Sequence, residues 1–161
     1  MNPNIYLWIP LLPLIGALVA GLPGWFGRPV SRSVAHSATI LGVAVSCALS
    51  LYVLYQHYWG GAESYNGTVY TWAVADGIRI EVGFLVDRLT AMMMVVVTSV
   101  SLMVHIYTIG YMGHDEENWP ADSKLRDNGY QRFFAYIALF TFSMLMLVMA
   151  NNFMQLFFGW E

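Results

Sequence analysis

The sequence predicts an all-α integral membrane protein with four complete transmembrane helices, the start of a fifth, and a β-hairpin between the second and third helices. Composition is the first observation behind this prediction: 58% of the 161 residues are hydrophobic and only 11% are charged, against about 25% charged residues in soluble domains. The second is that long uncharged stretches separate the clusters of charge. The third is a strand-like alternation within one polar connection.

Four segments are each long enough to cross a bilayer, which takes about 20 mostly apolar residues. They cover residues 5–26, 34–55, 89–112 and 133–150. A fifth apolar segment begins near Asn152 and continues to Glu161, and Asn151-Asn152 predicts a tight turn before it. The first segment has no basic residues ahead of it and contains three prolines, so we interpret it as a retained helix rather than a signal peptide.

The connection of residues 57–84 is predicted to hold the hairpin. Its part TVYTWAV-ADG-IRIEVGF alternates in side-chain character and is rich in β-branched and aromatic residues, which favours strands. Asp76-Gly77 lies between the two halves and is typical of a two-residue hairpin turn. Asn66-Gly67-Thr68 matches a glycosylation acceptor, but a turn before the hairpin is the favoured interpretation because Asn-Gly is a strong turn former.

Lysine and arginine residues set the predicted orientation, because cytoplasmic loops carry an excess of them. Five of the seven belong to the first and third connections: Arg28, Arg32, Lys124, Arg126 and Arg132. The hairpin connection has Arg79, with Arg88 at the membrane edge. This bias places the first and third connections in the cytoplasm, and the N-terminus and the hairpin on the opposite side. The sequence contains no basic patch of the kind that would indicate nucleic acid as a partner.

Glu161 is the main candidate site residue because it is predicted to lie inside the membrane. If the fifth helix enters near Asn152, a rise of about 1.5 Å per residue places Glu161 roughly 13–14 Å deep in a hydrocarbon core about 30 Å thick. Burial raises a carboxyl pKa and a nearby Lys or Arg lowers it, so a carboxyl held between these influences can load and release a proton. The alternatives are a protonated glutamate bonded between helices and a residue that ends a helix at an interface.

Three further residues are secondary candidates. His105 lies well inside the third predicted helix, where an imidazole either relays protons near neutral pH or serves as a structural residue. Asp87 and Arg88 precede that helix and are interpreted as an interfacial pair, with Arg88 snorkelling towards the headgroups. Cys47 is the one cysteine, so an intrachain disulfide and a cysteine-based metal cluster are excluded. Cys47 itself is interpreted as a small buried hydrophobe.

Two long stretches carry a resemblance to a known family: VDRLTAMMMVVVTSVSLMVHIYTIGYM and QRFFAYIALFTFSMLMLVMANNFMQLFFGWE, in this order after the hairpin. They resemble the L-type (chain 5) antiporter-like membrane subunit of the proton-pumping NADH:quinone oxidoreductase, respiratory complex I, in its bacterial form. The resemblance covers essentially the whole chain. Family members are several times longer and carry GWE within the fifth helix, so the resemblance implies an N-terminal fragment.

The resemblance also implies a function and a location. The chain would belong to the membrane arm that couples electron transfer to proton translocation, as a multi-pass protein of the bacterial inner membrane with its N-terminus and hairpin on the periplasmic side. Its division would be residues 1–56 for helices 1 and 2, 57–84 for the hairpin loop, 85–131 for helix 3 and a cytoplasmic loop, and 132–161 for the start of the proton-translocating antiporter-like domain.

Site residues and partners are implied in the same way. Glu161 matches the fifth-helix glutamate, which in the family pairs with a lysine on the seventh helix, and that lysine is absent from this sequence. No cofactor is expected on this chain, because NADH, flavin, iron–sulfur clusters and quinone are handled by other subunits. The implied partners are the other membrane-arm subunits, the lipid bilayer and protons.

Three alternatives stay open. A subunit of a multisubunit sodium/proton antiporter and a membrane subunit of an energy-converting hydrogenase share the GWE-type helix. A purely structural role, in which the chain is a helical scaffold and Glu161 stays protonated and silent, belongs to a different class.

Overall fold

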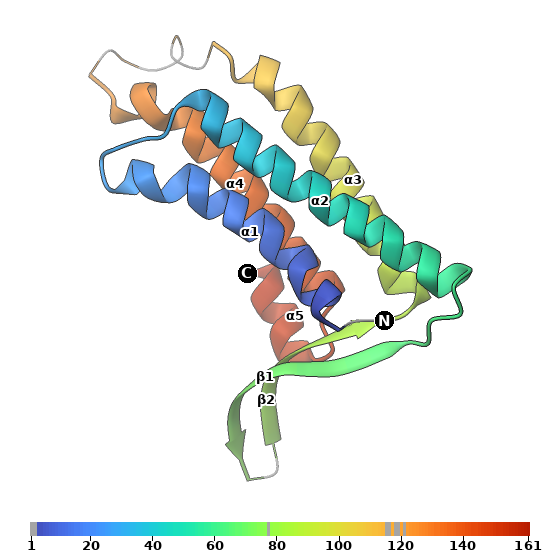
Figure 1. Ribbon diagram of the computed structural model, residues 1–161. Helices are drawn as coiled ribbons and strands as arrows, with labels where there is room; N and C mark the ends of the chain where they lie inside the picture. Colours follow the sequence, from blue (N-terminus) through green and yellow to red (C-terminus); the bar gives the residue numbers. More distant parts are fainter. Residues whose placement is uncertain (1–2, 77, 115–116, 118–119, 121) are drawn as a thin grey trace.

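A computed structural model describes residues 3–76, 78–114, 117, 120 and 122–161, without the side chains of residues 75, 78 and 124–127. Within these residues the chain forms five helices and one two-stranded antiparallel sheet (Figure 1). The elements are α1 (Asn4–Trp25), α2 (Arg32–Tyr58), β1 (Tyr65–Ala75), β2 (Ile78–Val86), α3 (Arg88–Tyr111), α4 (Lys124–Val148) and α5 (Phe153–Trp160). The predicted helical fold, with its hairpin between the second and third helices, is confirmed.

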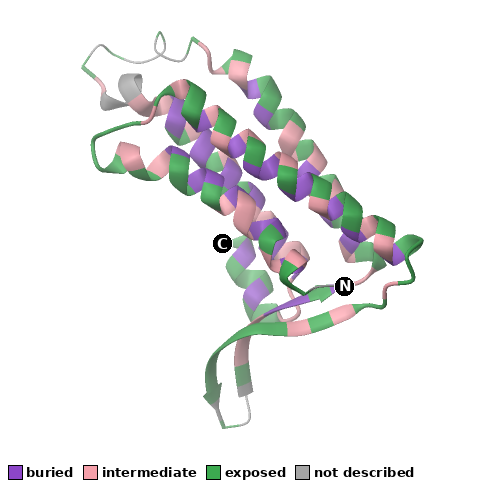
Figure 2. Ribbon diagram, viewed as in Figure 1, coloured by how far each residue is buried: buried purple, intermediate pink, exposed green. Residues whose placement is uncertain are grey.

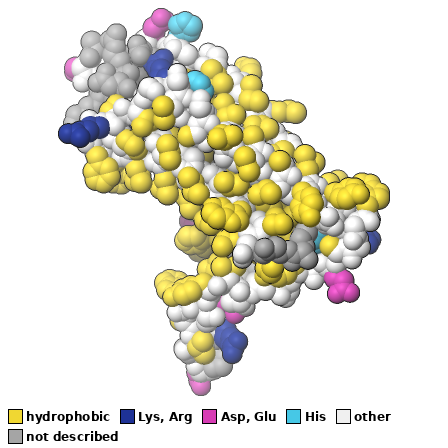
Figure 3. All heavy atoms as spheres, in the orientation of Figure 1, with side chains coloured by type: hydrophobic (Ala, Val, Ile, Leu, Met, Phe, Trp, Pro, Cys, Tyr) yellow, Lys and Arg dark blue, Asp and Glu magenta, His cyan; other side chains and the backbone are white. Residues whose placement is uncertain are grey.

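Four helices, α1 to α4, are long and apolar enough to cross a membrane, with Asn128–Val148 as the apolar part of α4. Between 22% and 39% of each apolar stretch is buried within the chain. The remaining residues of these stretches include many exposed large hydrophobic side chains. Figure 3 shows hydrophobic side chains over the visible face of the helices. Such a surface favours aggregation in water but is compatible with lipid.

Small residues let α1 and α2 approach closely. A Cβ atom on Gly42 would lie 2.7 Å from the carbonyl oxygen of Leu12, so no larger residue fits at this crossing. One turn further along α2, the Ser46 hydroxyl donates to the carbonyl oxygen of Ile9 at 2.7 Å. Small side chains and hydroxyl-to-backbone bonds are the usual means of helix association where lipid provides no hydrophobic drive.

The main core lies at the hairpin end of the bundle, where helices and sheet meet (Figure 2). Phe84 and Val86 of β2 are buried there, at 2% and 0% exposure. They pack with residues from α1 to α4 and from the turn after α4, namely Tyr6, Ile9, Val53, Ala91, Met94, Leu145, Met146 and Met149. The end of β2 is therefore part of the bundle, whereas the far end of the hairpin projects from it (Figure 1).

The backbone of β2 is also joined to the end of α4. The Leu85 amide donates to the carbonyl oxygen of Met149 at 2.9 Å. Phe84 and Ala150 form an antiparallel bridge beside this bond. The turn between α4 and α5, predicted at Asn151-Asn152 and confirmed there, thus lies directly against the sheet.

Side chains from α5 and its cap complete this junction. The Gln155 side chain is 4% exposed, and its Oε1 accepts a hydrogen bond from the Gly83 amide at 2.9 Å. The Asn152 amide group donates to the carbonyl oxygen of Glu81 at 2.8 Å. Because a buried backbone donor without a partner costs about 1–3 kcal/mol, Gln155 and Asn152 fix the hairpin against the α4–α5 turn.

The start of α4 differs from the prediction. The helix begins at Lys124 rather than at residue 133, so part of the connection predicted from its polarity is helical. Two contacts hold these extra turns: Gln131 donates to the carbonyl oxygen of Val30 at 2.7 Å, and Tyr130 is 3% exposed beside α2. The polar residues before residue 133 indicated where the chain leaves the membrane, whereas the helix itself begins earlier, at Lys124.

The Asn66-Gly67 segment also differs from the prediction. It lies inside β1, where Asn66 pairs with Leu85 and Gly67 with Phe84, so the turn interpretation is wrong. Pairing with a buried partner strand outweighs the local preference of Asn-Gly for turns. The predicted hairpin turn starts at Asp76, which has a positive φ of 48° as such turns require, while Gly77 lies outside the described residues.

Candidate functional site

The seating of α5 determines where Glu161 points. Gln155 and Gly159, one turn apart, are the buried positions of this helix. A Cβ atom on Gly159 would lie 2.9 Å from the Leu147 amide nitrogen and 3.0 Å from the Ser143 carbonyl oxygen. The face of α5 that carries Gln155 and Gly159 is therefore pressed against the backbone of α4.

Glu161 lies on the other side of α5. It follows Gly159 by two positions, and a rotation of about 100° per residue turns its side chain away from α4. Its backbone continues the helical pattern, with its amide donating to Phe157 at 3.0 Å, and its side chain is exposed. No ion pair to Glu161 is found in the part of the chain that the structure describes. The carboxylate therefore faces away from α4 and is exposed.

His105 is fully buried at 0% exposure, on the face of α3 that meets α4. Its Nδ1 lies 2.8 Å from the Ser101 carbonyl oxygen, and the Ser101 hydroxyl lies 2.6 Å from that of Thr141 on α4. When Nδ1 donates to the carbonyl, a neutral ring leaves Nε2 as an acceptor. Nε2 is buried without a hydrogen-bond partner among the described residues. The structure does not bring His105 and Glu161 together: His105 is buried between α3 and α4, whereas Glu161 is exposed at the end of α5.

A second histidine, His36 on α2, was not predicted as a site residue. Its Nδ1 lies 3.0 Å from the Tyr130 hydroxyl, and the Arg32 guanidinium lies over the Tyr130 ring with Cζ at 5.1 Å from the centroid. The rings of His36 and His105 are 6.2 Å and 6.1 Å from the ring of Phe134. Arg32, His36 and Tyr130 thus form a polar cluster near the α1–α2 connection. The Phe134 ring lies near both His36 of this cluster and His105. The one sequence signal for this cluster was four-residue spacing, which puts Arg32 with His36 on one helix face.

Asp87 and Arg88 have separate partners. Asp87 is the N-cap of α3, and its Oδ1 accepts a hydrogen bond from the Thr90 amide at 2.7 Å. Arg88 donates from Nε to the carbonyl oxygen of His57 at 3.2 Å, and its Cζ lies 5.8 Å from the centroid of the Tyr58 ring. The two side chains form no ion pair with each other in the described structure. Asp87 still has an extended backbone and Arg88 begins the helix, so each contacts a different element.

The cap at Asp87 gives a prediction on stability. The bond from the Thr90 amide favours the ionised carboxylate and so lowers the pKa of Asp87 below its ordinary value of 3.8. The contribution of the ionised Asp87 cap to the free energy of unfolding is therefore complete above the ordinary pKa. It is lost as the pH falls through the lowered pKa of the folded protein. We expect Asp87→Ala to reduce the free energy of unfolding by about 1 kcal/mol at pH 7.

The measurement is denaturant unfolding of the full gene product in detergent micelles, at pH 7 and at pH 3. The difference in the free energy of unfolding between wild type and Asp87→Ala should be smaller at pH 3 than at pH 7. Asp87→Asn, which keeps a capping side chain, is the matched control and should stay close to wild type at both values. Equal stability of the alanine variant and wild type at pH 7 would show that the cap contributes nothing.

Other side chains that could bind a metal are dispersed. No group of three or more His, Cys, Asp or Glu residues gathers within the described residues. Cys47 is buried, with its Sγ 3.5 Å from the Ser99 hydroxyl oxygen. Glu161, His105 and His36 are side chains of a type that can form hydrogen bonds and exchange a proton.

Comparison with known proteins shows what this chain is similar to. Residues 72–134 match the family model for the N-terminus of NADH-ubiquinone oxidoreductase (complex I) chain 5. Over 98% of its length the chain is 60% identical to NADH-quinone oxidoreductase subunit L of Neisseria meningitidis, and spans 21% of that protein. It is 42% identical to subunit L of Rhodobacter capsulatus over 95% of its length, and 38% identical to chain 5 of Arabidopsis thaliana over 98%, spanning 20% and 21% of these relatives. The resemblance seen in the sequence is confirmed.

Proposed function

We propose that this chain, as a relative of the subunit L and chain 5 proteins of complex I, acts in a membrane-arm subunit that couples NADH:quinone oxidoreduction to proton translocation. The observation that carries the proposal is the 60% identity to subunit L over 98% of the chain. Four helices of membrane-spanning length and composition support it. The chain spans about a fifth of the length of such relatives, so the activity of the whole relatives is carried to this chain only as a proposal.

Glu161 is the proposed proton-handling group. Its place directly after the apolar helix α5 and the direction of its side chain, away from α4, support this role. A cation brought beside this carboxyl group favours release of its proton, and removal of the cation favours proton uptake. His105 is proposed as a secondary relay, supported by its buried Nε2 without a partner in the described chain. NADH, flavin, iron–sulfur clusters and quinone are proposed to act on other subunits.

The proposed location is the bacterial inner membrane, with the N-terminus and hairpin on the periplasmic side. The α1–α2 and α3–α4 connections lie together at one end of the bundle, and the hairpin and N-terminus lie at the other (Figure 1). A hydrogen bond from Arg32 to the Gly113 carbonyl oxygen, at 2.9 Å, joins the two connections. The excess of basic residues at this end supports its cytoplasmic placement. The proposed partners are other membrane-arm subunits.

The test compares inverted membrane vesicles from cells with and without the gene. With the gene, NADH is expected to drive proton uptake, and without it this uptake should fall while soluble NADH dehydrogenase activity persists. The competing antiporter function predicts a different result: a sodium pulse would release protons from the vesicles with no NADH present. Gene-dependent sodium exchange without gene-dependent NADH-driven uptake would overturn the proposal.

A further inference from the structure

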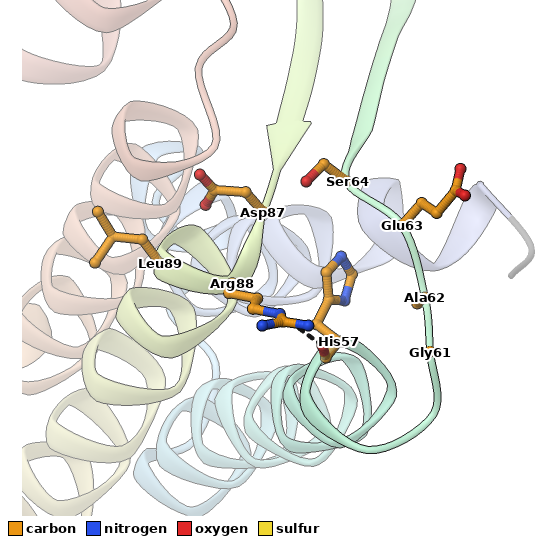
Figure 4. Close-up of a pocket in the computed structure, with 8 residues that line it drawn as sticks. All are labelled: His57, Gly61, Ala62, Glu63, Ser64, Asp87, Arg88 and Leu89. Carbon is orange, nitrogen blue, oxygen red and sulfur yellow. Dashed lines mark hydrogen bonds between the residues drawn. The ribbon is translucent and has the colours of Figure 1, made fainter.

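An open pocket of about 640 Å³ lies at the hairpin end of the bundle. It is formed where the last turn of α2 and the first turn of α3 meet the segment of residues 61–64, which leads into β1. Figure 4 shows the His57 ring rising from the end of α2 between Arg88 and this segment. The pocket takes no part in the site around Glu161.

Arg88 supplies hydrogen-bond donors to this pocket. Its Nε is engaged with the His57 carbonyl oxygen and its plane lies near the Tyr58 ring, which together hold the guanidinium in place. The two Nη nitrogens have no hydrogen-bond partner in the described part of the chain. A held guanidinium with its outer donors unused is suited to a phosphate, which it can contact with two parallel bonds.

His57 supplies a buried acceptor. Its side chain is 1% exposed, and its Nδ1 is 3.0 Å from the Val53 carbonyl oxygen. A neutral ring that donates from Nδ1 has a lone pair on Nε2, and Nε2 has no partner among the described residues. Because buried polar atoms are nearly always satisfied, this nitrogen indicates a missing donor, either a ligand group or a water that bridges to one.

Two carboxylates line the same pocket and differ in what they can bind. The Asp87 carboxylate is occupied by the helix cap at Thr90. Glu63 is exposed on the segment of residues 61–64 and points outward from the pocket (Figure 4). A ligand with only negative charge would meet both carboxylates, whereas one that also carries a cation would complement Glu63 at the rim.

The surroundings are those of a membrane edge. Tyr55, Tyr58 and Trp59 cluster at the end of α2. The ring centroids of Tyr55 and Tyr58 lie 5.9 Å and 5.8 Å from that of Trp59. Such rings are typical of the headgroup level of a bilayer. Leu89, at the start of α3, is 69% exposed and lines the pocket. The apolar surface of α3 that begins there is suited to an acyl chain.

We propose that this pocket binds the headgroup of a phospholipid that carries both a phosphate and a primary amine, as phosphatidylethanolamine does. The phosphate lies on the Nη donors of Arg88. The ammonium group lies at the rim of the pocket on the side of Glu63, and a bridging water connects it to Nε2 of His57. The acyl chains follow the exposed face of α3 below Leu89.

The experiment measures lipid binding by native mass spectrometry on the full gene product, purified from its own membrane and stripped of lipid in detergent. Phosphatidylethanolamine, phosphatidylcholine, phosphatidylglycerol and inorganic phosphate are added separately. One molecule of phosphatidylethanolamine should be retained about tenfold more tightly than the other two lipids, and Arg88→Gln should weaken it by about tenfold, as expected for loss of a charged hydrogen bond. Arg28→Gln, at the opposite end of the bundle, is the matched control and should change nothing.

A second variant keeps the test decisive if Arg88→Gln fails to fold. Glu63→Gln alters an exposed side chain and should retain phosphatidylethanolamine while losing its preference over phosphatidylglycerol. Unchanged preference in this variant overturns the proposal. So does equal binding of all three lipids, tighter binding of phosphatidylglycerol, or displacement of the lipid by inorganic phosphate, which would mark a site for a soluble anion.

Discussion

Glu161→Gln is expected to reduce NADH-driven proton uptake by the full gene product to about a tenth of wild type or less, since a positioned proton-transfer group typically contributes about 10²–10⁴-fold. The amide has nearly the same shape but cannot bind and release a proton. The exposed side chain of Glu161 makes no ion pair within the described residues, so assembly should be unaffected. The measurement is proton uptake into inverted vesicles, with NADH oxidation recorded in the same sample.

A matched control separates this effect from a general loss of charge. Glu117→Gln makes the same carboxyl-to-amide change in the α3–α4 connection, where Glu117 is exposed, and should leave proton uptake at the wild-type level. Wild-type uptake in Glu161→Gln would contradict the proton-handling role. The structural alternative, in which Glu161 is protonated and silent, would then be the better interpretation.

Gly159→Leu is expected to be among the most destabilising single substitutions in the chain. The new side chain would start within 3.0 Å of the Leu147 amide nitrogen and the Ser143 carbonyl oxygen. Overpacking typically costs about 1–3 kcal/mol, and we expect the upper end because backbone atoms of α4 cannot move aside as side chains do. Since α5 would be pushed off α4, the Gln155 contact with Gly83 should be lost as well.

The measurement is the thermal unfolding midpoint of the full gene product in detergent, together with limited proteolysis near the α4–α5 turn. Gly110→Leu is the control, because a Cβ atom on Gly110, also within a helix, meets nothing within 4 Å. Both variants carry the same change in helix propensity and hydrophobicity. Equal midpoints for the two would show that the close contact at Gly159 does not hold α5 in place.

The sequence was sufficient to predict the helices and the hairpin because both depend on local patterns. Length and apolarity mark a segment that can span lipid, and the alternation on either side of Asp76 marks two strands. The start of α4 was missed for a physical reason. Polarity reports where the chain leaves the membrane, whereas the extra turns at Lys124 are held by the contacts of Tyr130 and Gln131 with the α1–α2 region.

The candidate site was predictable only in part. The position of Glu161 at the end of an apolar segment follows from the sequence, but the direction of its side chain follows from the close contact of Gly159 with α4. The cluster of His36 with Tyr130 joins residues 94 positions apart, and no local pattern predicts such a pairing. The same holds for the pocket at His57 and Arg88, which are separated along the chain by the whole hairpin.

The junction between the hairpin and the α4–α5 turn imposes an order on biosynthesis. Gly83 leaves the ribosome 72 residues before Gln155, the side chain that later satisfies its amide. Until α3 and α4 have been inserted and the turn at Asn152 has reached the same face, the inner edge of β2 has open backbone donors. A ribosome that pauses within this interval presents an unpaired strand edge, which other chains can join. The translation rate across α3 and α4 therefore sets how long the nascent protein is exposed to mispairing.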